Sequence, residues 1–100
     1  MTMQIVENWA DLKGKVLDSY PSKTAEGFVT VELKVSDVKD VEGFRNLLDD
    51  RQGETVYVNV PKAVWREMSA ESGAKVTCRV RMAGQRNLYA HPERVKVEEP

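Results

Sequence analysis

Cysteine, histidine and long apolar runs are scarce in this chain of 100 residues. Cys78 is the only cysteine, so no disulfide can form within the chain. His91 is the only histidine and lies far from Cys78 in the sequence, so a zinc site with the usual number of ligands cannot be assembled within one chain. No segment approaches the ~20 apolar residues of a membrane-spanning helix, and no signal peptide is visible. We therefore expect a cytoplasmic protein without a metal or another cofactor.

Motifs of catalytic sites are missing as well. The sequence has no glycine-rich phosphate-binding loop and no G-x-S-x-G turn. Asp49 and Asp50 could hold a cation, but adjacent acids in a polar loop are usually just solvated. His91, which precedes Pro92, has no nucleophile that the sequence identifies as its partner. We therefore expect a non-enzymatic protein, and a small enzyme or ligand carrier is the least favoured alternative.

The charge is nearly balanced overall but unevenly distributed. The net charge is −1, made up of −4 in residues 1–60 and +3 in residues 61–100. Between Lys75 and Lys96, Glu93 is the single acid among several basic residues. If any surface of the protein attracts a polyanion, we expect the residues from Lys75 to Lys96 to form that surface.

Three runs alternate strictly between apolar and polar residues: 28–35, 54–60 and 75–82. A period of two places one apolar row against a core and one polar row toward solvent, as in half-buried strands. Cys78 falls in an inward row, which predicts a buried thiol. We predict two further strands, at Lys13–Tyr20 and at Leu88–Val97, the latter interrupted at His91-Pro92.

One segment, Pro61–Ala70, has the pattern of a helix. Proline suits its first position, and Val64 and Met68 lie one turn apart on one face. Gly73 is placed to follow its C-terminus. Trp65 on this helix is expected to plug one end of a barrel.

Residues Asp37–Gly53 are less regular. Phe44, Leu47 and Leu48 have the spacing of one helical turn, and we expect this segment to cover an end of the barrel. The same apolar residues could contact a protein partner. This supports an alternative function as a protein-interaction domain, an adaptor or a subunit of a larger assembly.

The elements are expected in the order strand, strand, strand, helix, strand, strand, which predicts a single all-β domain with one short helix over residues 1–100. Within this domain, we expect a barrel at about 12–97 that follows a lead-in at 1–11. The local motifs that accompany this order are Gly14-Lys15-Val16, Val29-Thr30-Val31-Glu32-Leu33, Val56-Tyr57-Val58-Asn59-Val60-Pro61, Gly73-Ala74-Lys75-Val76, Leu88-Tyr89-Ala90 and Val95-Lys96-Val97. Together they resemble the OB-fold, and in particular the nucleic-acid-binding OB domains of single-stranded DNA-binding proteins. The segment 37–53 is longer than the minimal OB loop. An SH3-like barrel is the alternative fold, disfavoured by the helix position and the chain length.

The resemblance implies a five-stranded Greek-key barrel that binds single-stranded nucleic acid, DNA in preference to RNA. It places the site on outward residues of the second and third strands and on the flanking loops. An aromatic platform of Tyr57 with Phe28 or Tyr89 would stack bases, each stack contributing ~1–3 kcal/mol. The polar residues expected to join this platform are Lys23, Lys34, Asn59, Arg79, Arg81 and Arg86.

Each of these residues also has a simpler interpretation. An outward tyrosine often serves only cross-strand packing, and Arg79 and Arg81 can be a solvated strand face. Glu32 points outward in the middle of the expected site, where it would repel phosphates. Salt dependence separates the two leading functions, because phosphate binding weakens steeply with salt and an apolar protein interface does not.

Overall fold

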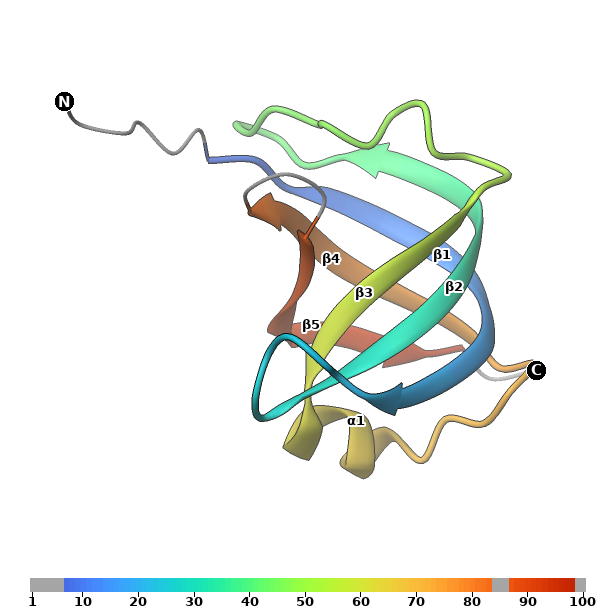
Figure 1. The fold of residues 1–100 in the computed structure, drawn as a ribbon. Helices are drawn as coiled ribbons and strands as arrows, with labels where there is room; N and C mark the ends of the chain where they lie inside the picture. The colour runs from blue at the N-terminus through green and yellow to red at the C-terminus, as the bar shows by residue number, and fades with distance from the viewer. Residues whose placement is uncertain (1–6, 84–86, 99–100) are drawn as a thin grey trace, which may run out of the picture.

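The computed structural model describes residues 7–83 and 87–98, which form five strands and one helix (Figure 1). The elements are β1 (Ala10–Pro21), β2 (Phe28–Asp40), β3 (Thr55–Pro61), α1 (Lys62–Met68), β4 (Lys75–Ala83) and β5 (Asn87–Val97). The predicted order of elements is confirmed. Several bounds differ from the prediction; among the strands, β1 begins earlier, and β5 continues through the interruption predicted at His91-Pro92.

The strands form one sheet that closes in a ring in the order β1-β2-β3-β5-β4. β1 pairs antiparallel with β2 along its length and with β4 over residues 10–15. β1 therefore connects the β2–β3 side of the ring to the β4–β5 side. β3 and β5 run parallel and pair only at Val58 with Leu88 and Asn59 with Tyr89. This short contact brings the outer face of β3 beside that of β5.

Gly14 allows β1 to approach β2 closely at the point where β1 bends. The β1–β2 register shifts between Lys13 and Gly14. A Cβ at position 14 would lie 2.4 Å from the carbonyl oxygen of Lys34 and 2.8 Å from Cγ of Leu33. The strands can therefore pass at this distance only if residue 14 has no side chain.

Alternate residues of the strands point into the ring and form the core, as the period of two predicts. The buried apolar strand residues are Ala10, Leu12, Val16, Val31, Leu33, Val35, Val56, Val58, Val60, Val76, Cys78, Val80, Leu88 and Ala90. The buried position predicted for Cys78 is thereby confirmed. The opposite row of each strand is left for the outer surface, where the candidate site lies.

α1 closes one end of the ring, opposite the end covered by residues 41–54 (Figure 1). Trp65 is buried against the core, which confirms the predicted plug. The helix ends earlier than predicted, because Ser69 adopts a left-handed conformation with a φ of 50°. The prediction that Gly73 follows the helix terminus is wrong; Gly73 lies in the turn before β4. Within residues 7–83 and 87–98, no helix has the length and apolar character needed to cross a bilayer.

The segment between β2 and β3 does not contain the predicted helical turn. The Asn46 side chain accepts a hydrogen bond from the Leu48 backbone N–H and donates one to the Asp40 carboxylate, both at 2.8 Å. Such side-chain bonds compete with helical hydrogen bonds, which explains the difference. Leu48 is buried in the core, whereas Phe44 and Leu47 are exposed. The segment thus covers its end of the ring mainly with Leu48.

The buried thiol makes the free energy of unfolding depend on pH in the alkaline range. Burial, assisted by the negative charge of Asp11, raises the pKa of Cys78 from 9.0 to about 12. The unfolded chain loses this proton first, so it binds fewer protons than the folded protein between these two pH values. Stability should therefore fall as the pH rises from about 9 toward about 12. We expect the urea midpoint to fall more steeply with pH for the wild type than for Cys78→Ala; equal slopes would contradict the prediction.

Candidate functional site

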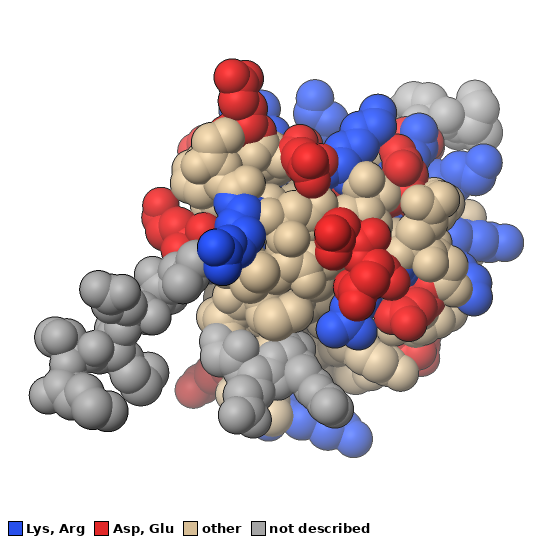
Figure 2. Space-filling model, turned by 90° about the horizontal axis from the view of Figure 1, so that it is seen from above, with Lys and Arg blue, Asp and Glu red and all other residues tan. Residues whose placement is uncertain are grey.

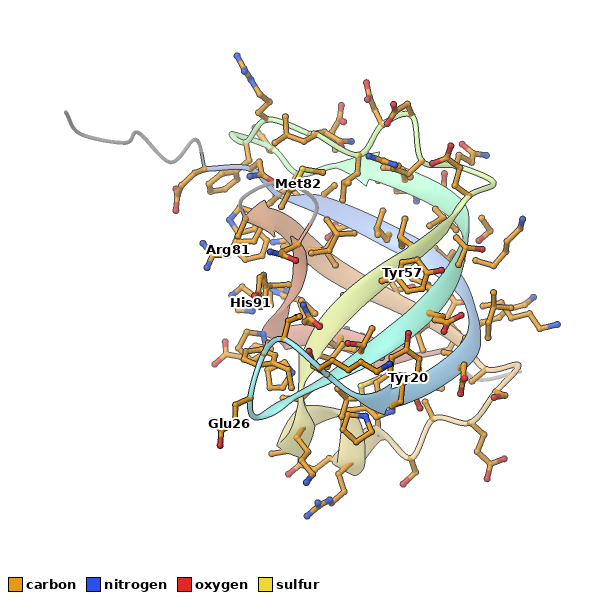
Figure 3. The ribbon with its side chains drawn as sticks, viewed as in Figure 1. Tyr20, Glu26, Tyr57, Arg81, Met82 and His91 are labelled. Atoms are coloured by element: carbon orange, nitrogen blue, oxygen red, sulfur yellow. The ribbon has the colours of Figure 1, made fainter. Side chains whose placement is uncertain are left out.

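Two pairs of aromatic rings line a groove on the outer surface. Phe28 and Tyr89 meet edge to face with their centroids 5.5 Å apart, and Trp9 and His91 are tilted with centroids 5.4 Å apart. The groove, which we call the aromatic groove, has a volume of about 350 Å³. Its lining residues are Trp9, Phe28, Pro61, Arg81, Tyr89, Ala90, His91 and Pro92. Figure 3 shows Arg81 and His91 on the same side of the ring.

A smaller hollow of about 190 Å³ adjoins the aromatic groove. Trp9 and His91 line both hollows and therefore stand at their shared border. Arg79 and Phe44 line the smaller one. Among the described residues, no acid lines either hollow, while each is lined by one arginine.

Local hydrogen bonds and strand register hold Phe28 and Tyr89 in place. The Phe28 carbonyl accepts a 2.9 Å bond from the Ser22 backbone N–H, which fixes the β1–β2 loop at the start of β2. On β5, Leu88 and Ala90 are buried, so Tyr89 between them points outward. The parallel contact between β3 and β5 then brings Tyr89 close to Phe28.

Trp9 is positioned by its neighbour Asn8. The Asn8 side chain donates to the Met82 carbonyl at 2.9 Å and accepts from the Met82 N–H at 2.8 Å. The Trp9 backbone N–H donates to the Arg45 carbonyl at 3.1 Å. These bonds fasten the segment before β1 to the end of β4 and to the segment between β2 and β3. Over residues 7–9 the structure has one isolated bridge, between Asn8 and Arg45.

His91 sits where β5 bulges against β4. Val80 pairs with Ala90 and Cys78 with Val95, so four residues of β5 lie opposite one residue of β4. This irregularity accommodates Pro92, which cannot donate to a regular ladder. The Glu93 backbone N–H donates to Nδ1 of His91 at 3.1 Å. The bulge therefore keeps the strand continuous and fixes the imidazole beside Trp9.

The predicted basic residues differ in how they are held. Arg79 makes hydrogen bonds of 2.9 and 3.2 Å to the Asp11 carboxylate, and this bonding raises the pKa of Arg79. Arg81 is exposed and forms no ion pair with any residue of the described ranges. Arg81 is therefore better placed than Arg79 to meet a phosphate. Lys23 is exposed in the β1–β2 loop.

A second group of outer-face residues lies farther along β2 and β3. Tyr57, with 55% of its surface exposed, stands directly opposite Glu32. Tyr20 on β1 stands opposite Thr30 on the same face, and we call Tyr20, Glu32 and Tyr57 the tyrosine face. Burial, together with a hydrogen bond and the negative charge of Glu32, raises the pKa of Tyr20. Beyond this group, Lys34 is exposed opposite Lys15, which adds positive charge at this end of β2.

Asn59 lies between the aromatic groove and the tyrosine face. It occupies the outer row of β3 as predicted, but only 7% of its surface is exposed. Its Oδ1 accepts a 3.0 Å hydrogen bond from the Thr30 hydroxyl. Asn59 therefore links the strands, and its carbonyl oxygen is already engaged.

The structure thus divides the predicted site into two parts. Phe28, Tyr89 and Arg81 meet in the aromatic groove, whereas Tyr57 and Lys34 lie farther along the sheet. Arg86 falls outside the described residues. Sequence reasoning missed Trp9 and His91 as groove residues. Extending the alternation of Leu88, Tyr89 and Ala90 by one step would have placed His91 outward beside Tyr89.

The end of the molecule covered by residues 41–54 has a different character. Figure 2 shows acidic side chains gathered near the middle of this end, with basic side chains around them. The segment contains four acids and two arginines. Arg51 lies 3.6 Å from the Asp50 carboxylate and 3.4 Å from that of Glu54. This end is less suited to a polyanion than the aromatic groove.

Known proteins provide no direct guide to the activity. Comparison with protein-family models, curated proteins and solved structures gives no significant match for this chain. Within the described ranges, no three His, Cys, Asp or Glu side chains are grouped to hold a metal ion.

Proposed function

We propose that this protein binds single-stranded nucleic acid, DNA in preference to RNA, and catalyses no reaction. The aromatic groove carries the proposal, because two ring pairs and the exposed Arg81 line one hollow without an acid. Aromatic side chains stack on bases whatever their sequence, and arginine binds phosphate and also stacks. These are the two requirements for holding a single strand.

We further propose that the closed sheet is a Greek-key barrel of the OB type. The helix between the third and fourth strands supports this assignment, as does a candidate site that includes the outer face of β2 and β3. From Phe28 to Lys34, β2 advances by about 20 Å at ~3.4 Å per residue. A strand running from the aromatic groove to Lys34 would pass Asn59 and the tyrosine face, and OB domains engage ~4 or more nucleotides.

Fluorescence anisotropy with labelled single strands tests the proposal. Oligo-dT and a mixed-sequence single-stranded RNA would be titrated with the protein at low and at moderate salt. We expect saturable binding, tighter for DNA, whose log affinity falls linearly with log salt concentration. Failure of both strands to bind at low salt, where phosphate attraction is strongest, would contradict the proposal.

Replacing Arg81 with alanine should remove one phosphate contact. The slope of log affinity against log salt should then become shallower by ~0.7, the value for one phosphate on a single strand. Arg66→Ala provides the matched control, because Arg66 is an exposed arginine on α1, away from the groove. Equal slopes for the wild type and both variants would show that Arg81 does not contact the strand.

The alternative of a protein-interaction domain rests on the exposed Phe44 and Leu47. Their exposed fractions are 40% and 37%, but Leu48, the third residue predicted for such a surface, is buried. Phe44 also lines the hollow beside Trp9, so it adjoins the proposed nucleic-acid site. The salt titration separates the two functions, because an apolar protein interface would be nearly insensitive to salt.

A further inference from the structure

We propose that Glu32, which lies directly opposite Tyr57 and diagonally from Tyr20, makes the protein prefer guanine at one position of the bound strand. This inference rests on the proposed function and adds a base preference to it. Its basis is the placement of one carboxylate between two tyrosines on three adjacent strands.

The register of β1, β2 and β3 brings these side chains to one face. Tyr57 lies directly opposite Glu32, and Tyr20 lies opposite Thr30, two residues from Glu32 on the same strand. Directly opposed residues have their Cβ atoms ~4.5–5.5 Å apart, and diagonal neighbours remain within reach of long side chains. Figure 3 shows Tyr20 and Tyr57 on the same side of the sheet. A base stacked on the exposed Tyr57 ring would therefore have its edge beside Glu32.

The surroundings of Glu32 suit a hydrogen-bond acceptor for a ligand. Together with burial, the nearby Glu32 carboxylate raises the pKa of the Tyr20 hydroxyl, and a carboxylate has several lone pairs that can accept hydrogen bonds from a ligand. Within the described ranges, no lysine or arginine forms an ion pair with Glu32. The half-buried negative charge repels phosphates, so a strand crossing here would turn its bases toward Glu32 and its phosphates away. Arg81 and Lys34, at the two ends of the face, can then receive the phosphates.

Guanine presents the donor pattern that a carboxylate accepts best. The Watson–Crick edge of guanine places N1–H next to the N2 amino group, so two donors can meet the two carboxylate oxygens. Adenine and cytosine each present one amino group beside an acceptor nitrogen. Thymine presents one N–H between two carbonyl oxygens, which the carboxylate repels. Bases splayed out of a single strand are read on this edge.

Three labelled oligonucleotides test the preference on the wild-type protein. They are an oligo-dT, the same oligomer with one central guanine, and the same oligomer with hypoxanthine at that position. We expect the guanine oligomer to bind roughly 5- to 100-fold more tightly than oligo-dT, which is the range of a good bidentate contact. Hypoxanthine lacks the N2 amino group, so it should lose most of this gain.

Two variants assign the preference to Glu32. Glu32→Gln removes the paired acceptors and the charge, so the guanine preference should disappear while affinity for oligo-dT stays equal or rises. Asp18→Asn is the matched control, because Asp18 lies opposite Glu32 on β1 and the substitution removes the same charge. This control should keep the full guanine preference. Thermal melting of both variants near the wild-type temperature would show that each remains folded.

The outcomes separate this inference from the proposed function. Equal wild-type affinities for the three oligomers would overturn the guanine preference and leave single-strand binding intact. A preference that persists in Glu32→Gln, or is lost equally in Asp18→Asn, would overturn the role of Glu32. If no oligomer binds at low salt, the proposed function fails and the base preference fails with it.

Discussion

Replacing Gly14 with alanine is expected to lower the free energy of unfolding by about 2–3 kcal/mol, the upper range for overpacking a tight site. The new Cβ would lie 2.4 Å from the carbonyl oxygen of Lys34, which is backbone and cannot rotate away. β1 and β2 would have to separate where β1 also pairs with β4. For a domain of this size the melting temperature should fall by roughly 10–20 °C.

Thermal and urea denaturation followed by circular dichroism measure this effect. Gly53→Asn is a suitable control, because nothing lies within 4 Å of a Cβ at position 53 and its φ is +86°. Asparagine tolerates such a left-handed conformation better than most residues, so this variant should stay close to the wild type. A Gly14→Ala variant as stable as this control would show that the strands are not so close at residue 14.

Replacing Trp9 with alanine is expected to weaken single-strand binding by roughly 5- to 100-fold, which corresponds to the loss of one base stack. Trp9 borders both the aromatic groove and the smaller hollow, so its ring can contact bases in either. It precedes β1 and lies outside the sheet, so its loss should affect folding less than the loss of a core residue. Anisotropy titration with oligo-dT at fixed salt gives the affinity directly.

Two companion variants make the Trp9 result specific. Trp9→Phe retains a ring and should lose less affinity than Trp9→Ala. Leu17→Ala removes an exposed apolar side chain, 44% exposed on β1, and should bind like the wild type. Unchanged affinity in Trp9→Ala would place the bound strand elsewhere, and a parallel loss at Tyr57→Ala would then favour the tyrosine face.

Sequence periodicity predicted the strands and their inward rows because it reflects a local property of extended chain. Val31, Val58 and Cys78 are buried as their alternation requires. The burial of Trp65 was also predicted correctly. A large apolar residue on a short helix beside a closed sheet can be buried only against an open end of that sheet. Properties that depend only on the alternation of residues along a strand are therefore accessible without any three-dimensional information.

The features that sequence analysis missed depend on contacts between distant segments. Position 14 must be glycine because the Lys34 backbone lies so close to it. Asn59 has a low exposure because it lies on β3 between β2 and β5. The loss of the expected turn near Leu48 follows from one side-chain hydrogen bond of Asn46. The interruption predicted at His91-Pro92 coincides with a register shift in the β4–β5 pairing, and local sequence does not reveal that β5 continues beyond this shift.

The two-pair contact between β3 and β5 is the weakest seam of the closed sheet, because the other neighbouring strands pair over longer stretches. Opening motions of the ring should therefore begin at this seam. A strand bound from Phe28 on β2 to Tyr89 on β5 would bridge it from outside. A ligand bound in the groove would then hold β3 and β5 together. It would stabilise the closed form by a free energy that grows with the logarithm of the ratio of its concentration to the dissociation constant.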